Sequence, residues 1–334
     1  MTSPDMDLPT SPYFRLEQLG EGVYFAVATP GTGALGNAGI VNLGDETLVF
    51  DTLMTAQAAR DLRAVAERLT GRAPRYVVNS HYHGDHTMGN AAFDDATIIA
   101  TTATAPLIST ENGSLLRMLR ENGQEFDAQQ RAEAAAATDA AVRRDIEEQS
   151  DDYRALMREA NETRVRPPDI TFQSRLTIHG SRRQAQLISW GGGHTPSDAV
   201  LYLPTERILF AGDLIFYRSH ASLNFGDPAE WLRILGEMER LEVDTLAPGH
   251  GAVTTRAAIA EQRAYIEALL AIALQAAQAG KTAEAAAATP IPQAYTGFGF
   301  PSGFAENMRV LLNYQTDRMN ATGKAEVATG ERTI

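Results

Sequence analysis

Histidine and aspartate side chains cluster in the stretch Asn79–His86, which reads N-S-H-Y-H-G-D-H. His81 and His83 are two residues apart at the end of a predicted strand, so both are expected to point to the same side. Asp85 and His86 follow on a turn that begins with a permissive glycine. Four metal-binding residues within six positions exceed what one tetrahedral ion with an open catalytic position can use. The spacing therefore favours two neighbouring metal ions that share one loop.

Three further candidate ligands each follow a short apolar strand and have glycine beside them. They are His194 in G-G-G-H-T-P, Asp213 in F-A-G-D-L and His250 in A-P-G-H-G. A glycine-flanked residue at a strand end is well placed to project above the edge of a sheet. Five of the seven histidines occupy these positions or the first cluster, so a shared metal site is a better interpretation than five separate structural roles.

These blocks resemble the metallo-β-lactamase-fold superfamily, whose signature is H-x-H-x-D-H followed by a separate His, Asp and His. The resemblance covers roughly residues 22–279. The ligand set that it implies has two triads and one bridging residue: His81, His83 and His194 on the first metal, Asp85, His86 and His250 on the second, and Asp213 between them. The implied cofactor is a pair of divalent ions, with zinc expected and iron or manganese as alternatives, because His and carboxylate ligands accept all three.

The implied centre has the charge that hydrolysis needs. Two Zn²⁺ ions bring +4, Asp85 and Asp213 bring −2 and a bridging hydroxide brings −1, which leaves +1 to stabilise an oxyanion. The ions make hydroxide available at neutral pH by lowering the pKa of water to about 7. We therefore expect Asp85 and Asp213 to serve catalysis, with Asp85 orienting the attacking water.

Asp213 and the absence of cysteine separate this chain from most β-lactamases of the fold, in which the bridging position is usually cysteine or serine. The resemblance is closer to thioesterases, lactonases and glyoxalase II. We expect a hydrolase that uses a metal-bridging hydroxide to cleave an acyl bond in a thioester, a lactone or a related ester or amide. Two alternatives stay open: a mononuclear-iron sulfur dioxygenase of the same fold, and promiscuous β-lactamase activity.

Four other polar residues are candidates for supporting roles. The resemblance implies that Asp51, in V-F-D-T, supports the ligand loop without binding metal. Thr195 and Asp198 follow His194 and are interpreted equally as support for the ligands through hydrogen bonds or as caps of a turn. His220 is a candidate substrate-facing residue or oxyanion donor, although an exposed surface position is the preferred interpretation.

Short apolar strands and amphipathic helices are expected to position these residues. The predicted strands are Gly22–Ala28, Gly39–Leu43, Thr47–Asp51, Arg75–Asn79, Thr97–Ala100, Ile170–Phe172, Arg175–His179, Ala185–Trp190, Ala199–Leu203, Arg207–Ala211 and Thr245–Ala247. The predicted helices outside the inserted region are residues 56–69, Pro228–Leu241 and Thr255–Ala279. Two β-rich halves flanked by helices favour an α/β protein, an αββα four-layer sandwich.

One domain is expected over residues 12–334, with a helical insertion at 109–165 and an extension at 285–320. The insertion, rich in Ala, Glu, Gln and Arg, is interpreted as a solvated arm of one or two helices, with a lid or a dimer contact as the alternatives. The extension combines an aromatic cluster with a last helix to about Asp317. It is expected to anchor on the core, with a pocket wall or a homodimer contact as the alternatives.

The 334 residues carry a net charge of −13, which argues against nucleic acid as a partner and against a polybasic membrane anchor. No apolar run approaches the roughly 20 residues that cross a bilayer. Residues 1–10 lack the basic start and apolar stretch of a secretory signal. We therefore expect a cytoplasmic protein that acts on a small-molecule substrate.

Overall fold

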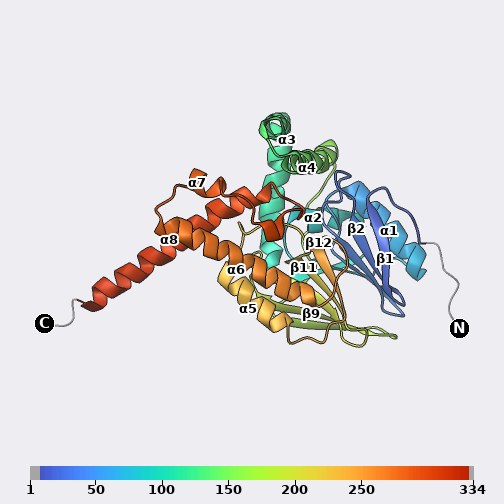
Figure 1. Ribbon diagram of the computed structural model, residues 1–334. Helices are drawn as coiled ribbons and strands as arrows, with labels where there is room; N and C mark the ends of the chain where they lie inside the picture. The colour runs from blue at the N-terminus through green and yellow to red at the C-terminus, as the bar shows by residue number, and fades with distance from the viewer. Residues whose placement is uncertain (1–7, 331–334) are drawn as a thin grey trace.

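Two β-sheets pack face to face in the computed structural model, which describes residues 8–330 (Figure 1). Helices cover the outer face of each sheet, so the predicted αββα sandwich, with its helical region and C-terminal helices, is confirmed. Residues 1–7 and 331–334 lie outside the described residues. They include most of the stretch in which no secretory signal is expected and the last four positions of the predicted domain.

The first sheet has seven strands, and they follow one another in chain order. They are β1 (Phe14–Gly20), β2 (Val23–Ala28), β3 (Ala38–Asn42), β4 (Thr47–Phe50), β5 (Tyr76–Val78), β6 (Thr97–Thr101) and β7 (Ile170–Phe172). β1 to β4 pair antiparallel and β4 to β7 pair parallel. β1 was not among the predicted strands, although its buried Phe14 and Leu16 alternate with the charged Arg15 and Glu17 in the two-residue period of a strand.

The second sheet has five strands, and two neighbouring strands, one of them at the edge of the sheet, carry candidate ligands. The order across the sheet is β12 (Thr245–His250), β11 (Ile208–Phe216), β10 (Asp198–Leu203), β9 (Gln184–Gly191) and β8 (Arg175–His179). β11 continues to Phe216, past its predicted end at Ala211, and β12 continues to His250. Asp213 therefore lies within β11 and His250 is the last residue of β12, whereas both were predicted to follow the ends of shorter strands.

Side chains on opposite faces of the first sheet enter different cores, as the two-residue period of a strand requires. Phe25 faces the second sheet, where its ring lies 6.3 Å from that of Phe210. Tyr24 and Ala26 face the opposite side and pack with the apolar face of α1 (Ala56–Thr70). A third core joins the second sheet to α5 (Pro228–Met238) and α6 (Ala257–Gln278), which Figure 1 shows outside that sheet.

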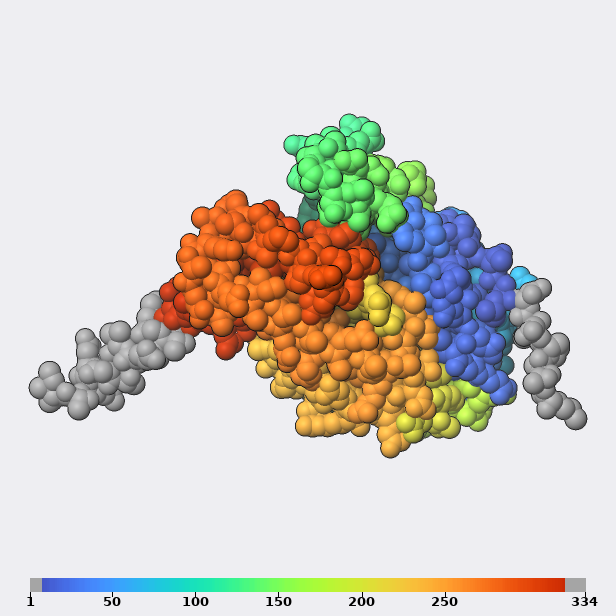
Figure 2. Space-filling view, viewed as in Figure 1, coloured from blue at the N-terminus to red at the C-terminus, as the bar shows by residue number. Residues whose placement is uncertain are grey.

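Two long helices occupy the region predicted as helical, and they begin five residues before its predicted start at 109. α3 (Thr104–Ala136) and α4 (Ala140–Glu159) form a hairpin between β6 and β7. In Figure 2 this green hairpin lies against the red C-terminal segment, where the Ser302 N–H donates to Asp145 over 2.9 Å. No helix in the described part of the chain is both long and apolar enough to cross a membrane.

The C-terminal region is helical beyond the predicted limit. α7 (Ala283–Ala287) precedes a short 3₁₀ turn, and α8 runs from Gly303 to Gly330 instead of ending near Asp317. The aromatic segment before α8 anchors on the core, as expected, because Tyr295 and Phe298 pack against the core of the second sheet. Phe300, however, lines a cavity that is described below.

Asp152 of α4 attaches the helical hairpin to the loop between β2 and β3. Its carboxylate is 1 % exposed and accepts hydrogen bonds from the Gly31 N–H at 3.1 Å and the Gly33 N–H at 2.6 Å. Burial raises the pKa of Asp152 to about 6, against the opposing effect of these two donors. One buried carboxylate thus joins an element without any recognisable motif to the edge of the first sheet.

We predict that Asp152→Ala lowers the free energy of unfolding by about 2 kcal/mol, because two backbone donors lose their acceptor. Asp152→Asn retains a carbonyl oxygen and should lose less. Asp151→Ala is the matched control, since this neighbouring side chain is 56 % exposed and pairs with Arg154 on the surface. Urea unfolding of the three variants measures the effect, and equal losses for Asp151→Ala and Asp152→Ala would contradict it.

Candidate metal centre

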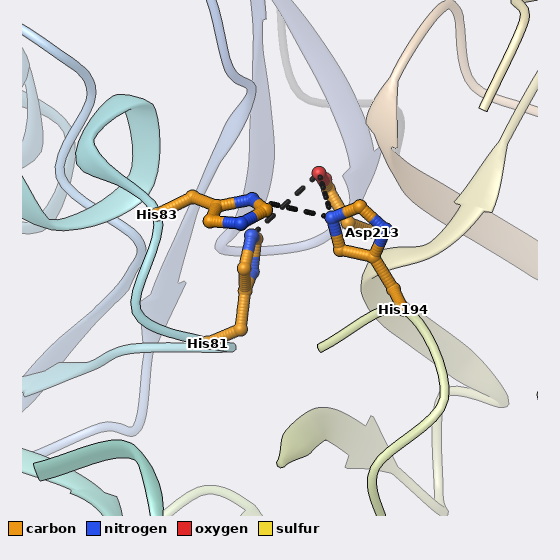
Figure 3. A group of neighbouring side chains, drawn as sticks. All are labelled: His81, His83, His194 and Asp213. Atoms are coloured by element: carbon orange, nitrogen blue, oxygen red, sulfur yellow. Dashed lines mark hydrogen bonds and ion pairs between the residues drawn. The ribbon is translucent and has the colours of Figure 1, made fainter. Parts of the chain in front are cut away.

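Five histidines and two aspartates converge in one cluster between the edges of the two sheets. They form two groups, each with ligand atoms within 4.8 Å of one another: His81, His83, His194 and Asp213, and Asp85, His86 and His250. Figure 3 shows the side chains of the first group pointing toward one another. The structure thus brings together all seven residues that the sequence analysis singled out as ligands. We call these seven residues the metal cluster.

Asp213 is the residue that contacts both groups of the metal cluster. Its Oδ1 lies 3.2 Å from His86 Nε2, and its Oδ2 lies 3.3 Å from His194 Nε2. The same Oδ2 is 3.4 Å from His250 Nε2. Asp85 belongs to one group, with its Oδ2 at 3.2 Å from His86 Nε2. This arrangement suits the bridging role predicted for Asp213.

Loops and strand ends from both sheets position the cluster. His81 and His83 lie on the loop that follows β5, and α2 (Gly84–Thr87) carries Asp85 and His86. The second sheet supplies the other ligands: His194 between β9 and β10, Asp213 from β11 and His250 from β12. The two halves of the site therefore come from different sheets, and sheet packing is what assembles it.

Asp51 orients His81 and His86 through hydrogen bonds, one of them direct and the other through Ser80. Its carboxylate is buried and accepts from the Ser80 N–H at 2.8 Å, the Ser80 hydroxyl at 2.7 Å and His86 Nδ1 at 3.0 Å. Because the Ser80 hydroxyl donates its proton to Asp51, its oxygen accepts from His81 Nδ1 at 2.9 Å. Both imidazoles therefore carry a proton on Nδ1 and turn Nε2 toward the cluster. Ser80 was missed by the sequence analysis, although it directly precedes His81.

The ring of His194 is fixed in the same way, but by a group that the sequence did not indicate. His194 Nδ1 donates to the carbonyl oxygen of Ser222 at 3.1 Å. Thr195 and Asp198 form no hydrogen bond to this ring. Asp198 instead accepts from the Gly193 N–H and the Thr195 hydroxyl, both at 2.7 Å. The turn-cap interpretation thus describes their hydrogen bonds, which brace the loop that carries His194.

The buried atoms at the centre fit a divalent metal. His81 Nε2, His86 Nε2 and Asp213 Oδ1 are buried without a hydrogen-bond partner among the described residues. Since Nδ1 of each ring donates, Nε2 of the neutral ring presents a lone pair. Lone pairs and carboxylate oxygens facing one another repel unless a proton or a cation lies between them. Imidazole nitrogen with carboxylate oxygen is a donor set that divalent transition metals accept.

The charges in the cluster are strongly coupled. Burial lowers the pKa of His83 to about 3. Burial also acts on His250, but Asp213 and Asp85 outweigh it and raise the pKa of His250 to about 9. The same two carboxylates raise the pKa of His86 well above its ordinary value, again against burial. Without a metal ion, protons on these two rings balance the carboxylates, and a metal ion would replace them.

A cavity of about 220 Å³ opens on the metal cluster. Its apolar lining includes Leu35, Phe225 and Phe300. Phe300 belongs to the aromatic cluster for which a pocket wall was an alternative interpretation, whereas Leu35 and Phe225 had no sequence signal. His220 also lines it and is 3 % exposed, so the preferred interpretation as a surface histidine was wrong. The reason is that the C-terminal segment covers its ring, with Phe304 at 5.5 Å.

Two packed sheets with outer helices and a His/Asp cluster between their edges define the metallo-β-lactamase fold. The family model of the metallo-beta-lactamase superfamily matches residues 31–250. The chain belongs to this superfamily, whose members are hydrolases, and the resemblance found in the sequence is confirmed.

Proteins that are similar to this chain in sequence or in fold include an alkylsulfatase and two metallo-beta-lactamases of solved structure. Over 225 residues the chain is 24 % identical to a linear primary-alkylsulfatase of Pseudomonas sp. (strain ATCC 19151), a match that covers 61 % of this chain and 39 % of that protein. The chain therefore spans about two fifths of the length of this curated relative. A metallo-beta-lactamase from Pontibacter korlensis is similar in structure, with a TM-score of 0.56, 17 % identity and coverage of 76 % of this chain and 99 % of its own. The DIM-1 metallo-beta-lactamase is similar as well, with a TM-score of 0.53, 19 % identity and coverage of 77 % of this chain and 98 % of its own. Both structural similarities concern the fold alone.

We predict that Asp51→Ala weakens divalent metal binding by about 10–100-fold, because the rings of His81 and His86 lose the group that orients them. Titration calorimetry of the metal-free protein with Zn²⁺ measures the affinity. Asp45→Ala is the control, since Asp45 is an exposed aspartate outside the metal cluster that accepts from the Ser181 N–H on a turn. Unchanged affinity in Asp51→Ala would show that Asp51 serves folding only.

We also predict that metal affinity falls as the pH is lowered from 9 to 6. In the metal-free protein the raised pKa values mean that His250 and His86 hold protons in this range, and these protons must leave when metal binds. One displaced proton corresponds to about a tenfold loss of affinity per pH unit. Competition with a chromogenic chelator at several pH values measures the effect. An affinity independent of pH would contradict it.

Proposed function

We propose that this metallo-β-lactamase-superfamily hydrolase cleaves an acyl bond in a small uncharged substrate: a thioester, a lactone or a related ester or amide. The observation that carries the proposal is the metal cluster, in which buried imidazole lone pairs and two carboxylates converge with Asp213 in contact with both groups. Two divalent ions are proposed, zinc first. A cytoplasmic location and a homodimer stay predictions.

The chain's own residues have distinct tasks in this proposal. Each group of the metal cluster would hold one ion, and Asp213 would contact both. Ions bound there would supply a nucleophile from water at neutral pH and stabilise negative charge on the substrate's carbonyl oxygen. The Asp85 side chain is more exposed than that of Asp213, 14 % against 3 %, and it lines the cavity. Asp85 is therefore the carboxylate placed to orient an attacking water and accept its proton.

Aromatic side chains keep the ligands in position and limit the access of water. Phe216 stacks on His250 with ring centroids 4.9 Å apart, and Trp231 lies 5.3 Å from His194. Phe225 lies 4.5 Å from His83 and is 47 % exposed, at the mouth of the cavity. A largely apolar entrance favours a substrate with an apolar part near the bond to be cleaved.

The charge of the lining supports an uncharged substrate. Among the described residues, no lysine or arginine lines this cavity or the two hollows that adjoin it. The acidic side chains outside the metal cluster that line them are Asp145, Glu148, Asp152, Glu306 and Glu111. An anionic group away from the metal ions would therefore face carboxylates without a compensating cation.

A second candidate is cleavage of a sulfate ester, which the similarity to the linear primary-alkylsulfatase favours. We rank it below acyl cleavage because a sulfate ester is anionic, and the lining offers no basic side chain to neutralise it among the described residues. The two candidates share the metal cluster and differ only in the substrate.

The test is hydrolysis by the zinc-loaded protein of 4-nitrophenyl acetate, a thioester, a lactone, 4-nitrophenyl sulfate and a chromogenic cephalosporin. We predict that a neutral acyl substrate reacts at least about tenfold faster than the sulfate, and that chelation abolishes the activity. His81→Ala should lower kcat/KM by about 100-fold or more. His179→Ala, an exposed histidine at the end of β8, is the control. Fastest reaction with the sulfate, or an unchanged His81→Ala, would refute the proposal.

A further inference from the structure

A second hollow adjoins the cavity on the side of the helical hairpin. Its volume is about 260 Å³, and it shares Leu35, His83, Asp85 and Phe225 with the lining of the cavity. The metal cluster therefore borders both spaces. We call this second space the side hollow, and the aliphatic and aromatic part of its wall consists of Leu35, Met54, Tyr82, Leu115, Tyr153 and Phe225. The proposed hydrolytic function assigns no ligand to it.

Side chains of the helical hairpin give the side hollow its apolar character. Leu115 of α3 and Tyr153 of α4 pack against the hydrophobic core of the hairpin, but they are only half-buried there. Met54, on the loop before α1, belongs to the same core and also lines the hollow. The side hollow is thus an open edge of a hydrophobic core. An apolar group that covers this surface removes it from water, which favours binding.

The polar groups of the side hollow offer little to a charged ligand. The Asn112 amide nitrogen donates to the Tyr82 carbonyl at 3.1 Å and to the Thr87 hydroxyl at 2.7 Å, so both of its protons are engaged. Glu111 is an exposed carboxylate of the lining. Among the described residues, no lysine or arginine lines the hollow. An anionic group would therefore meet a like charge without a compensating cation, whereas an uncharged aliphatic chain needs no polar partner.

The apolar wall is continuous with the metal cluster. The ring of His83 lies 4.6 Å from that of Tyr82 and 4.5 Å from that of Phe225, both measured between centroids. A Cβ at Gly84 would lie 3.6 Å from Leu115 Cδ2, so Leu115 is beside the residue that directly precedes Asp85. A reacting group at the metal cluster and a chain in the side hollow can therefore belong to one molecule.

We propose that the side hollow binds an aliphatic chain of the substrate while the bond to be cleaved lies at the metal cluster. The chain is attached either to the acyl carbon or to the leaving group, and its far end is uncharged, because Glu111 disfavours a carboxylate there. Each methylene group that leaves water favours binding by up to about fourfold. The inference rests on the proposed acyl hydrolysis and specifies its substrate as an ester, a thioester or a lactone with an aliphatic chain.

Two series of esters test the inference and distinguish the two attachments of the chain. One lengthens the acyl chain of a 4-nitrophenyl ester from acetate to hexanoate, and the other lengthens the alcohol of an acetate ester from methyl to pentyl. With the zinc-loaded protein we expect kcat/KM to rise at least about tenfold along at least one series. The series that responds identifies the side of the bond that carries the chain.

A substitution that fills the side hollow should remove this dependence. We expect Leu115→Trp to reduce the rise to about threefold or less. Met118→Trp is the matched control, since Met118 is also half-buried on α3 and packs against the same core but is not among the residues that line the hollow. It should keep the rise. No rise in either series, or a rise that Leu115→Trp leaves intact, would overturn the inference, while hydrolysis of the acetates would leave the proposed function standing.

Binding of a chain can also be measured without catalysis and without Leu115→Trp. 2-Octanone is an uncharged aliphatic ketone that cannot be hydrolysed. In spectra of the zinc-loaded protein with ¹³C-labelled methionine methyl groups, it should shift the Met54 signal, which is identified by its loss in Met54→Leu. Met238, in the core of the second sheet, is the control and should not shift.

The methyl signal separates the two ways in which the proposals can fail. An unchanged Met54 signal up to the solubility limit of the ketone would overturn the inference. If the wild type hydrolyses no ester, thioester or lactone, the proposed function fails, and the Met54 signal then decides whether the side hollow binds an aliphatic chain.

Discussion

Buried carboxylates that face imidazole lone pairs are the constraint on which this structure depends. Asp51 is satisfied by three donors from Ser80 and His86. Asp85 and Asp213 are not satisfied in this way, and they meet the Nε2 atoms of their histidine neighbours at 3.2–3.3 Å. Charge in a protein interior is costly unless it is compensated. The fold therefore has to hold the metal cluster in a fixed geometry in which a bound cation can compensate the negative charge of Asp85 and Asp213.

The strands meet this requirement because close packing beside the ligands leaves no room for side chains. A Cβ at Gly249 would lie 1.9 Å from Asp213 Oδ1, and one at Gly36 would lie 2.8 Å from His86 Nε2. The glycine before His250 is thus needed for the close approach of β12 to β11. The flanking glycines were expected to lift ligands above a sheet edge, whereas Gly249 lets the two strands that carry Asp213 and His250 approach each other.

The motif residues and the fold could be predicted from the sequence because their chemistry and period are local. Four apolar blocks end at or near a ligand, and the two-residue period of a strand is visible in β1 (Phe14–Gly20). β1 was nevertheless missed, although apolar and charged residues alternate along it. His220 was misplaced because its burial depends on Phe298 and Phe304, which are some eighty residues away in the chain. Contacts of this range have no local signal, so the burial of this ring had to come from the structure.

The same reasoning explains why superfamily membership does not determine the substrate. The family match ends at residue 250, but Tyr265, Phe300 and Asn307, which line the cavity or orient its polar groups, all lie beyond it. The helical hairpin adds Gln149, whose amide donates to the hydroxyl of Ser302 at 3.2 Å, and both residues line the cavity. The metal cluster thus comes from the two sheets and their loops, while part of the cavity wall comes from the helical hairpin and the C-terminal segment. Because these two elements lie outside the sheets, a protein that shares only the sheets can carry a different cavity wall around the same kind of metal cluster.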